Sequence, residues 1–66
     1  MIIIEKDVKK NVLTVRAISG GQLFILGVYD LNEYHYIHKQ LEDKVIVCNK
    51  DNIHMATFNV DAYTEV

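Results

Sequence analysis

Four side chains of this sequence could act as metal ligands, or as a nucleophile with a neighbouring base: Cys48, His35, His38 and His54. His35 and His38 stand three residues apart, so on a helix both imidazoles would face one ligand. A thiolate paired with an imidazole is the arrangement that cysteine-dependent enzymes use. Both kinds of site would require Cys48 or His54, which lie in a predicted hairpin, to come close to His35 and His38.

The predicted hairpin around Lys50-Asp51 decides whether Cys48 and His54 can meet. An even number of loop residues puts them on opposite faces, because directly opposed residues share a face, whereas an odd number would bring them together. The chain carries no metal-ligand spacing motif, and no nucleophile-elbow glycines surround Cys48. A lone cysteine after the apolar residues 45–47 is typical of a small buried side chain. We therefore predict no catalytic, metal or cofactor site, and a protein that is not an enzyme.

Four basic side chains lie in the first two predicted strands and the turn between them: Lys6, Lys9, Lys10 and Arg16. They could bind an anionic ligand such as a nucleotide, or they could be solvated side chains that keep edge strands from aggregating. The net charge of the chain is −2 and its isoelectric point is near 5.8, whereas nucleic-acid-binding domains carry a basic face. This charge argues against nucleic acid as a partner.

The 66 residues form one predicted domain, 1–66, which buries only about 60 % of the surface of its unfolded chain. Cys48 has no second cysteine to pair with, which is typical of a reducing compartment. The first residues lack the pattern of a signal peptide, and no apolar run is long enough to cross a membrane. These features predict a cytoplasmic protein without a membrane partner.

The stretch from Asp30 to Lys44 is predicted to hold the helix on which the other elements pack, over residues 31–43. Asp30 is a favourable N-cap residue, and Glu33 stands three positions later, as a capping box requires. An apolar stripe at helical spacing would face the core. The residues of that stripe are Leu31, Tyr34, Ile37 and Leu41.

The remaining residues predict five strands, at 2–8, 12–18, 23–29, 44–48 and 53–60. Gly20-Gly21 is the strongest turn signal, because tight hairpins require positive φ angles. Gly27 inside the third strand indicates a bulge or a close approach of the backbone. The fold class that follows is α+β, a small β-β-β-α-β-β domain with antiparallel hairpins packed on one amphipathic helix.

Several predicted strands carry apolar residues on both faces, and one helix can cover only one of them. The uncovered face requires a curled barrel, a second sheet or another subunit, and dimerisation is the simplest of these. Opposite the apolar stripe, the helix would present an exposed tyrosine with polar neighbours, which is typical of a protein interface. The predicted partner-binding residues are therefore Tyr36, Glu33, Gln40 and Asp43.

The function predicted from these features is that of a small non-enzymatic protein-binding module. It would be a homodimer that inhibits or regulates another protein, in the manner of phage or bacterial accessory proteins. The alternative is a small oligomer that binds an anionic ligand at a subunit junction. That site would use the four basic residues near the amino terminus: Lys6, Lys9, Lys10 and Arg16.

Overall fold

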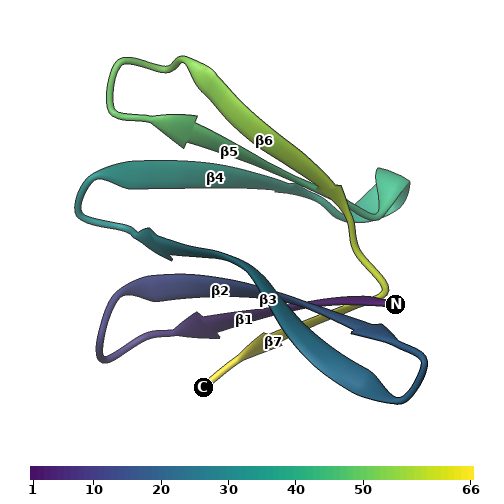
Figure 1. Ribbon diagram of the computed structural model, residues 1–66. Helices are drawn as coiled ribbons and strands as arrows, with labels where there is room; N and C mark the ends of the chain where they lie inside the picture. Colours follow the sequence, from purple (N-terminus) through teal and green to yellow (C-terminus); the bar gives the residue numbers. More distant parts are fainter.

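A computed structural model describes residues 1–66 and shows two packed β-sheets (Figure 1). The first sheet has the strand order β3-β2-β1-β7, and the second has the order β4-β5-β6. A single 3₁₀ turn, η1, joins β4 to β5. The elements are β1 (Ile2–Asp7), β2 (Val12–Ser19), β3 (Gln22–Asp30), β4 (Tyr34–Lys39), η1 (Gln40–Glu42), β5 (Lys44–Asn49), β6 (His54–Asn59) and β7 (Ala62–Glu65).

The predicted helix over residues 31–43 is wrong, and with it the α+β fold class. Residues 34–39 form β4 instead, with side chains that alternate between half-buried and exposed along the strand. Tyr36 faces inward and Ile37 is half exposed on the outer face, the reverse of the helical expectation. Leu41, assigned to the helix's apolar stripe, is fully exposed in η1. Two tyrosines and an isoleucine within residues 34–39 suit a strand. Tyr34 and Tyr36 also stand two positions apart, and this strand period competes with the helical period.

The polar groups of Asp30 act as predicted but stabilise a turn. Its carboxylate accepts hydrogen bonds from the main-chain and side-chain nitrogens of Asn32, both at 2.9 Å, and its carbonyl accepts one from the Glu33 N–H at 3.0 Å. Helix caps and Asx turns use the same acceptor on the same kind of residue. The signal at Asp30 therefore could not distinguish a helix start from a β3–β4 turn.

The core lies between the two sheets and consists of aliphatic side chains. The first sheet contributes Ile4, Leu13 and Val15, and β5 contributes Val45 and Val47, all fully buried. The second sheet, one of the three solutions left open, thus covers one apolar face of each sheet. The apolar side chains of residues 23–28 stay exposed.

The hairpins follow the predicted turn chemistry. Gly20 and Gly21 both have positive φ, 59° and 76°, as the two-residue β2–β3 turn requires. The predicted strands at 2–8, 12–18, 23–29, 44–48 and 53–60 agree with β1, β2, β3, β5 and β6 to within one residue at every end.

The last strand was not predicted as a separate element. After β6 the chain leaves the second sheet at Val60, and β7 then pairs in parallel with β1 (Figure 1). The carboxylate of Asp61 accepts a hydrogen bond of 2.6 Å from the Ile2 N–H at this crossing. One chain thus joins the two sheets at both β3–β4 and β6–β7.

Candidate interaction surface

Strand β3 carries the largest exposed apolar segment of the molecule. Leu23, Ile25 and Val28 are 60 %, 64 % and 59 % exposed, and Phe24 and Leu26 are about half exposed. Five large apolar side chains in six consecutive residues, the other being Gly27, are unusual on a free surface, and such patches commonly mark interaction sites. The exposed segment, residues 23–28, is called the β3 patch below.

The β3 patch lies on a sheet edge that is protected neither by short length nor by charged side chains. Natural edge strands are kept apart by short length, charged side chains or bulges that twist the edge away. The opposite edge, β7, has four residues and includes Glu65, and the β4 edge carries two histidines and Lys39. By contrast, β3 has nine residues and no charge before Asp30. Of these edges, β3 is the one best suited to accept a further strand.

The hydrogen bonds of neighbouring strands show which β3 backbone groups are free. Ile18 donates its N–H to the Met1 carbonyl at 2.8 Å and accepts a bond from the Met1 amino group at 3.1 Å, so its main chain faces β1. Leu23 stands opposite Ile18, so its N–H and C=O point away from β2. By the same alternation, the groups of Ile25 also face outward.

Beyond the bulge, the alternation continues from the other end of β3. The Leu31 N–H donates to the Asn11 carbonyl at 2.9 Å and so faces β2. Counting back along the strand, the N–H and C=O of Val28 point to the free edge. The β3 edge therefore presents main-chain groups at Leu23, Ile25 and Val28.

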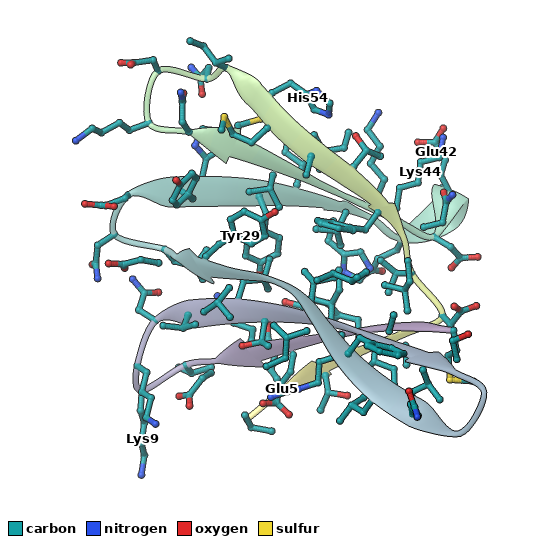
Figure 2. The ribbon with its side chains drawn as sticks, in the orientation of Figure 1. Glu5, Lys9, Tyr29, Glu42, Lys44 and His54 are labelled. Carbon is teal, nitrogen blue, oxygen red and sulfur yellow. The ribbon has the colours of Figure 1, made fainter.

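A β-bulge interrupts β3 at Leu26. Val15 stands opposite Gly27 and Arg16 stands opposite Ile25, so Leu26 has no partner in β2. At Gly27 the ring of Tyr29 passes so close that an added Cβ would lie 2.9 Å from ring atom Cε2. Tyr29 itself points between the sheets and packs edge-on against Tyr34 at 5.5 Å (Figure 2). Both predicted roles of Gly27, bulge and close approach, are thus present.

The predicted partner-binding residues do not share one face. Glu33 is exposed in the β3–β4 turn, whereas Gln40 and Asp43 lie in or after η1, at the opposite end of β4. Tyr36 is half-buried between the sheets and is not the exposed helical tyrosine that the prediction required. The surface that these four residues were expected to form depends on a helix that is not there.

Tyr36 and Tyr63 form a polar contact between the two sheets. Their hydroxyl oxygens are 2.6 Å apart, and the Tyr63 hydroxyl donates to Glu65 Oε1 at 3.0 Å. Tyr36 must then donate to Tyr63, since each hydroxyl has one proton. Burial, followed by the hydrogen bond that Tyr63 donates to the Glu65 carboxylate, raises the pKa of Tyr63 above its ordinary value of 10.0.

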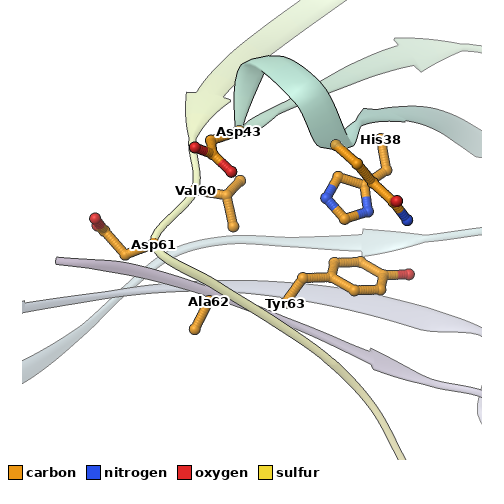
Figure 3. Close-up of a pocket in the computed structure, with 7 residues that line it drawn as sticks. His38, Asp43, Val60, Asp61, Ala62 and Tyr63 are labelled. Carbon is orange, nitrogen blue, oxygen red and sulfur yellow. The ribbon is translucent and has the colours of Figure 1, made fainter.

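A pocket of about 230 Å³ opens beside this contact, at the crossing from β6 to β7 (Figure 3). The ring of His38 lies over that of Tyr63, with centroids 4.4 Å apart, and so closes one side. Asp43 and Asp61 lie on the other side, and Asp61 is already bonded to Ile2. The Asp61 carboxylate and the Tyr63 hydroxyl thus already have hydrogen-bond partners elsewhere in the chain.

The candidate metal and nucleophile residues are only partly brought together, since His38 lies on the other face of the sheet from Cys48, His35 and His54. Cys48 stands opposite both His35 and His54 on the outer face of the second sheet, because a bulge in β6 shifts the register there. Of the two loop parities left open, the odd one is present, because the Asn49 N–H bonds the Ile53 carbonyl across residues 50–52, and it puts Cys48 and His54 on one face. The His54 ring bonds the Thr57 hydroxyl at 2.7 Å, and His38 lies on the inner face. No group of three His, Cys, Asp or Glu side chains in the structure converges to hold a metal ion.

The basic residues of the alternative prediction also fail to converge. The ammonium of Lys6 lies 5.7 Å from the centre of the Tyr36 ring, on the inner side of β1. The guanidinium of Arg16 pairs with Glu5 at 3.6 Å on the outer face. Lys9 and Lys10 lie in the exposed β1–β2 turn, where Lys9 points away from the body (Figure 2). These four residues do not form one anion site.

The β3 patch was not named among the predicted site residues, although a signal for it was present. Residues 23–29 read as apolar on both faces, which suggested a covered central strand. The structure instead puts this strand at an edge, and a single sequence does not reveal strand order.

No helix of the structure is long and apolar enough to cross a membrane. Comparisons with protein-family models, curated proteins and solved structures found no match for this chain.

Proposed function

We propose that this chain is a non-enzymatic protein-binding module that inhibits or regulates another protein, and that it binds along the free edge of β3. The observation that carries this proposal is the β3 patch, with exposed main-chain groups and exposed apolar side chains on a strand that carries no charge before Asp30. An extended polypeptide that adds to a sheet edge uses both kinds of group at once. Its own main chain would bond β3, and its side chains would cover the patch.

The energies involved are of the right size for specific but moderate binding. Full burial of one large aliphatic side chain contributes about 1.5–3 kcal/mol, so covering the exposed halves of five contributes roughly 4–7 kcal/mol. Association costs about 4 kcal/mol or more in lost translational and rotational freedom. Main-chain hydrogen bonds to β3 and close packing must therefore supply the remaining affinity.

The alternative function, capture of an anionic ligand, has less support. It requires Lys6 and Arg16 to act together, whereas Lys6 stands over a ring on the inner side and Arg16 is paired with Glu5 on the outer face. A cytoplasmic site of action is part of the proposal. The buried free thiol of Cys48 supports it, since a reducing compartment preserves such a group.

Co-purification with matched variants tests the proposed function. The wild-type chain, Ile25→Lys and Thr64→Lys would each be tagged and cross-linked in the cells from which the sequence derives. Ile25→Lys places a charge in the β3 patch, and Thr64→Lys places the same charge on exposed β7 at the other edge of the same sheet. We expect one target to co-purify with wild type and Thr64→Lys but not with Ile25→Lys. Equal recovery with all three would count against β3 as the binding element.

A further inference from the structure

We infer that the strand taken up by β3 is β3 of a second copy, running antiparallel across a two-fold axis. In this arrangement Ile25 stands opposite Val28 of the second copy, and Leu26 stands opposite Gly27 of the second copy. The inference rests on the proposed function, because it concerns the same edge, which the second copy holds until the target displaces it. It would join the two four-stranded sheets into one continuous sheet.

The free main-chain groups of β3 have the symmetry that such a pair requires. Ile25 and Val28 both direct their N–H and C=O groups to the open edge, and they are equidistant from the midpoint between Leu26 and Gly27. An antiparallel partner must present bonding residues opposite bonding residues. A second β3 does this at both Ile25–Val28 positions when the axis passes through that midpoint.

The bulge provides the argument for self-association over binding of an unrelated regular strand. Between Ile25 and Val28, β3 has two residues where β2 has only Val15 between the corresponding positions. A regular strand meeting the free edge would face the same mismatch of one residue. A second β3 carries the same extra residue at the same place, so the register is restored on both sides of the bulge.

The side chains match in the same register. Ile25 and Val28 stand opposite Arg16 and Thr14 in β2, on the face away from the core, so both project from one face of the sheet. Opposed residues share a face, and Ile25 would therefore contact Val28 of the second copy directly. The nearest charge, Asp30, would lie opposite Leu23 of the second copy, so no like charges meet.

The area available is sufficient for a dimer of modest stability. The β3 patch exposes on the order of 500 Å² per copy, so a symmetric pair would bury at most on the order of 1,000 Å² in all. That value is at the lower limit for specific interfaces. The dimer should therefore dissociate on dilution.

Two double variants of the full chain test the arrangement, and they differ only in the sign of one charge. Ile25→Lys with Val28→Glu places an introduced ammonium opposite an introduced carboxylate at both symmetry-related positions. Ile25→Lys with Val28→Lys places ammonium opposite ammonium there. Sedimentation velocity over a concentration series measures the mass, and circular dichroism checks that each variant is folded.

We expect wild type and the Lys/Glu variant to approach twice the monomer mass of 7.6 kDa, and the Lys/Lys variant to remain at 7.6 kDa. Mixing the Lys/Lys variant with Ile25→Glu, Val28→Glu should restore the doubled mass. A wild type that stays at 7.6 kDa, or two double variants that behave alike, would overturn the inference. The Lys/Glu variant keeps the test decisive even if the Lys/Lys variant does not fold.

The same samples separate this inference from the proposed function. A monomeric wild type whose target is lost on Ile25→Lys would leave the proposed function intact and remove the second copy as the occupant. A dimer that responds to the charge pattern as expected, but whose Lys/Lys variant still binds the target, would support the inference and remove β3 as the binding site for the target. The second copy would then occupy β3, and the target would bind elsewhere.

Discussion

At the scale of single residues, the hydroxyl contact between Tyr36 and Tyr63 is the clearest link between the two sheets. Tyr36 belongs to β4 in one sheet and Tyr63 to β7 in the other, and their oxygens are 2.6 Å apart. Tyr63→Phe removes the acceptor of a partly buried hydroxyl, so it should lower the free energy of unfolding by about 1 kcal/mol in urea melts. The hydroxyl of Tyr29 makes no hydrogen bond, so Tyr29→Phe is the matched control and should change the free energy of unfolding little.

The same tyrosine predicts how stability depends on pH. Burial and hydrogen bonding hold the pKa of Tyr63 above its ordinary value of 10.0, so the folded state keeps this proton at a pH where the unfolded state releases it. The stabilisation is complete below about pH 10 and is lost progressively as the pH rises above it. Urea melts from pH 8 to 11 should show a steeper loss in wild type than in Tyr63→Phe. Parallel curves would mean that Tyr63 titrates normally.

Gly27 should tolerate no larger side chain. An alanine Cβ would lie 2.9 Å from the Tyr29 ring, whereas the smaller conformational freedom of unfolded alanine favours the variant by only about 0.4–1 kcal/mol. Overpacking of this kind costs about 1–3 kcal/mol, so Gly27→Ala should be destabilised on balance. Thermal melts would compare Gly27→Ala with the double variant Gly27→Ala, Tyr29→Leu. They would show whether removing the tyrosine ring restores the stability that the alanine costs.

At the scale of elements, β4 shows why part of the fold could be predicted and part could not. The strands of the two hairpins, 12–29 and 45–59, follow from alternation and from turn residues, both of which are local. The segment after Asp30 satisfies a helical stripe and a strand alternation equally well, and only packing against the first sheet decides between them. The pairing of Tyr36 with Tyr63 lies beyond any local pattern, since 27 residues separate them.

Two neighbouring substitutions distinguish the strand from the helix. Tyr36 contacts the core and Tyr63, so Tyr36→Ala should lower the free energy of unfolding by about 3 kcal/mol. Ile37 is 50 % exposed on the outer face, so Ile37→Thr should change it by less than about 0.5 kcal/mol. A helix with its apolar stripe inward would give the reverse order. Denaturant melts of both variants decide the matter.

At the scale of the whole molecule, β7 completes the first sheet and its removal should unfold the protein. It pairs with β1 from Ile3–Ala62 to Lys6–Glu65, and Tyr63 covers part of the core. Domains of this size have a total stability of roughly 3–10 kcal/mol, which the loss of one strand can exceed. Deletion of residues 62–66 should collapse the dispersion of amide signals in NMR spectra, whereas Thr64→Lys should retain it.

The pairing of β1 with β7 also affects how the chain can be made. Ile2 and Asp61, which bond at this junction, are 59 residues apart, so β1 leaves the ribosome long before the strand that must lie beside it. During that interval the β2–β3 hairpin can form, but its apolar inner face has no second sheet to cover it. Completion of the fold must therefore wait until synthesis has passed residue 65, and a pause in translation before that point would prolong the exposure of an aggregation-prone hairpin.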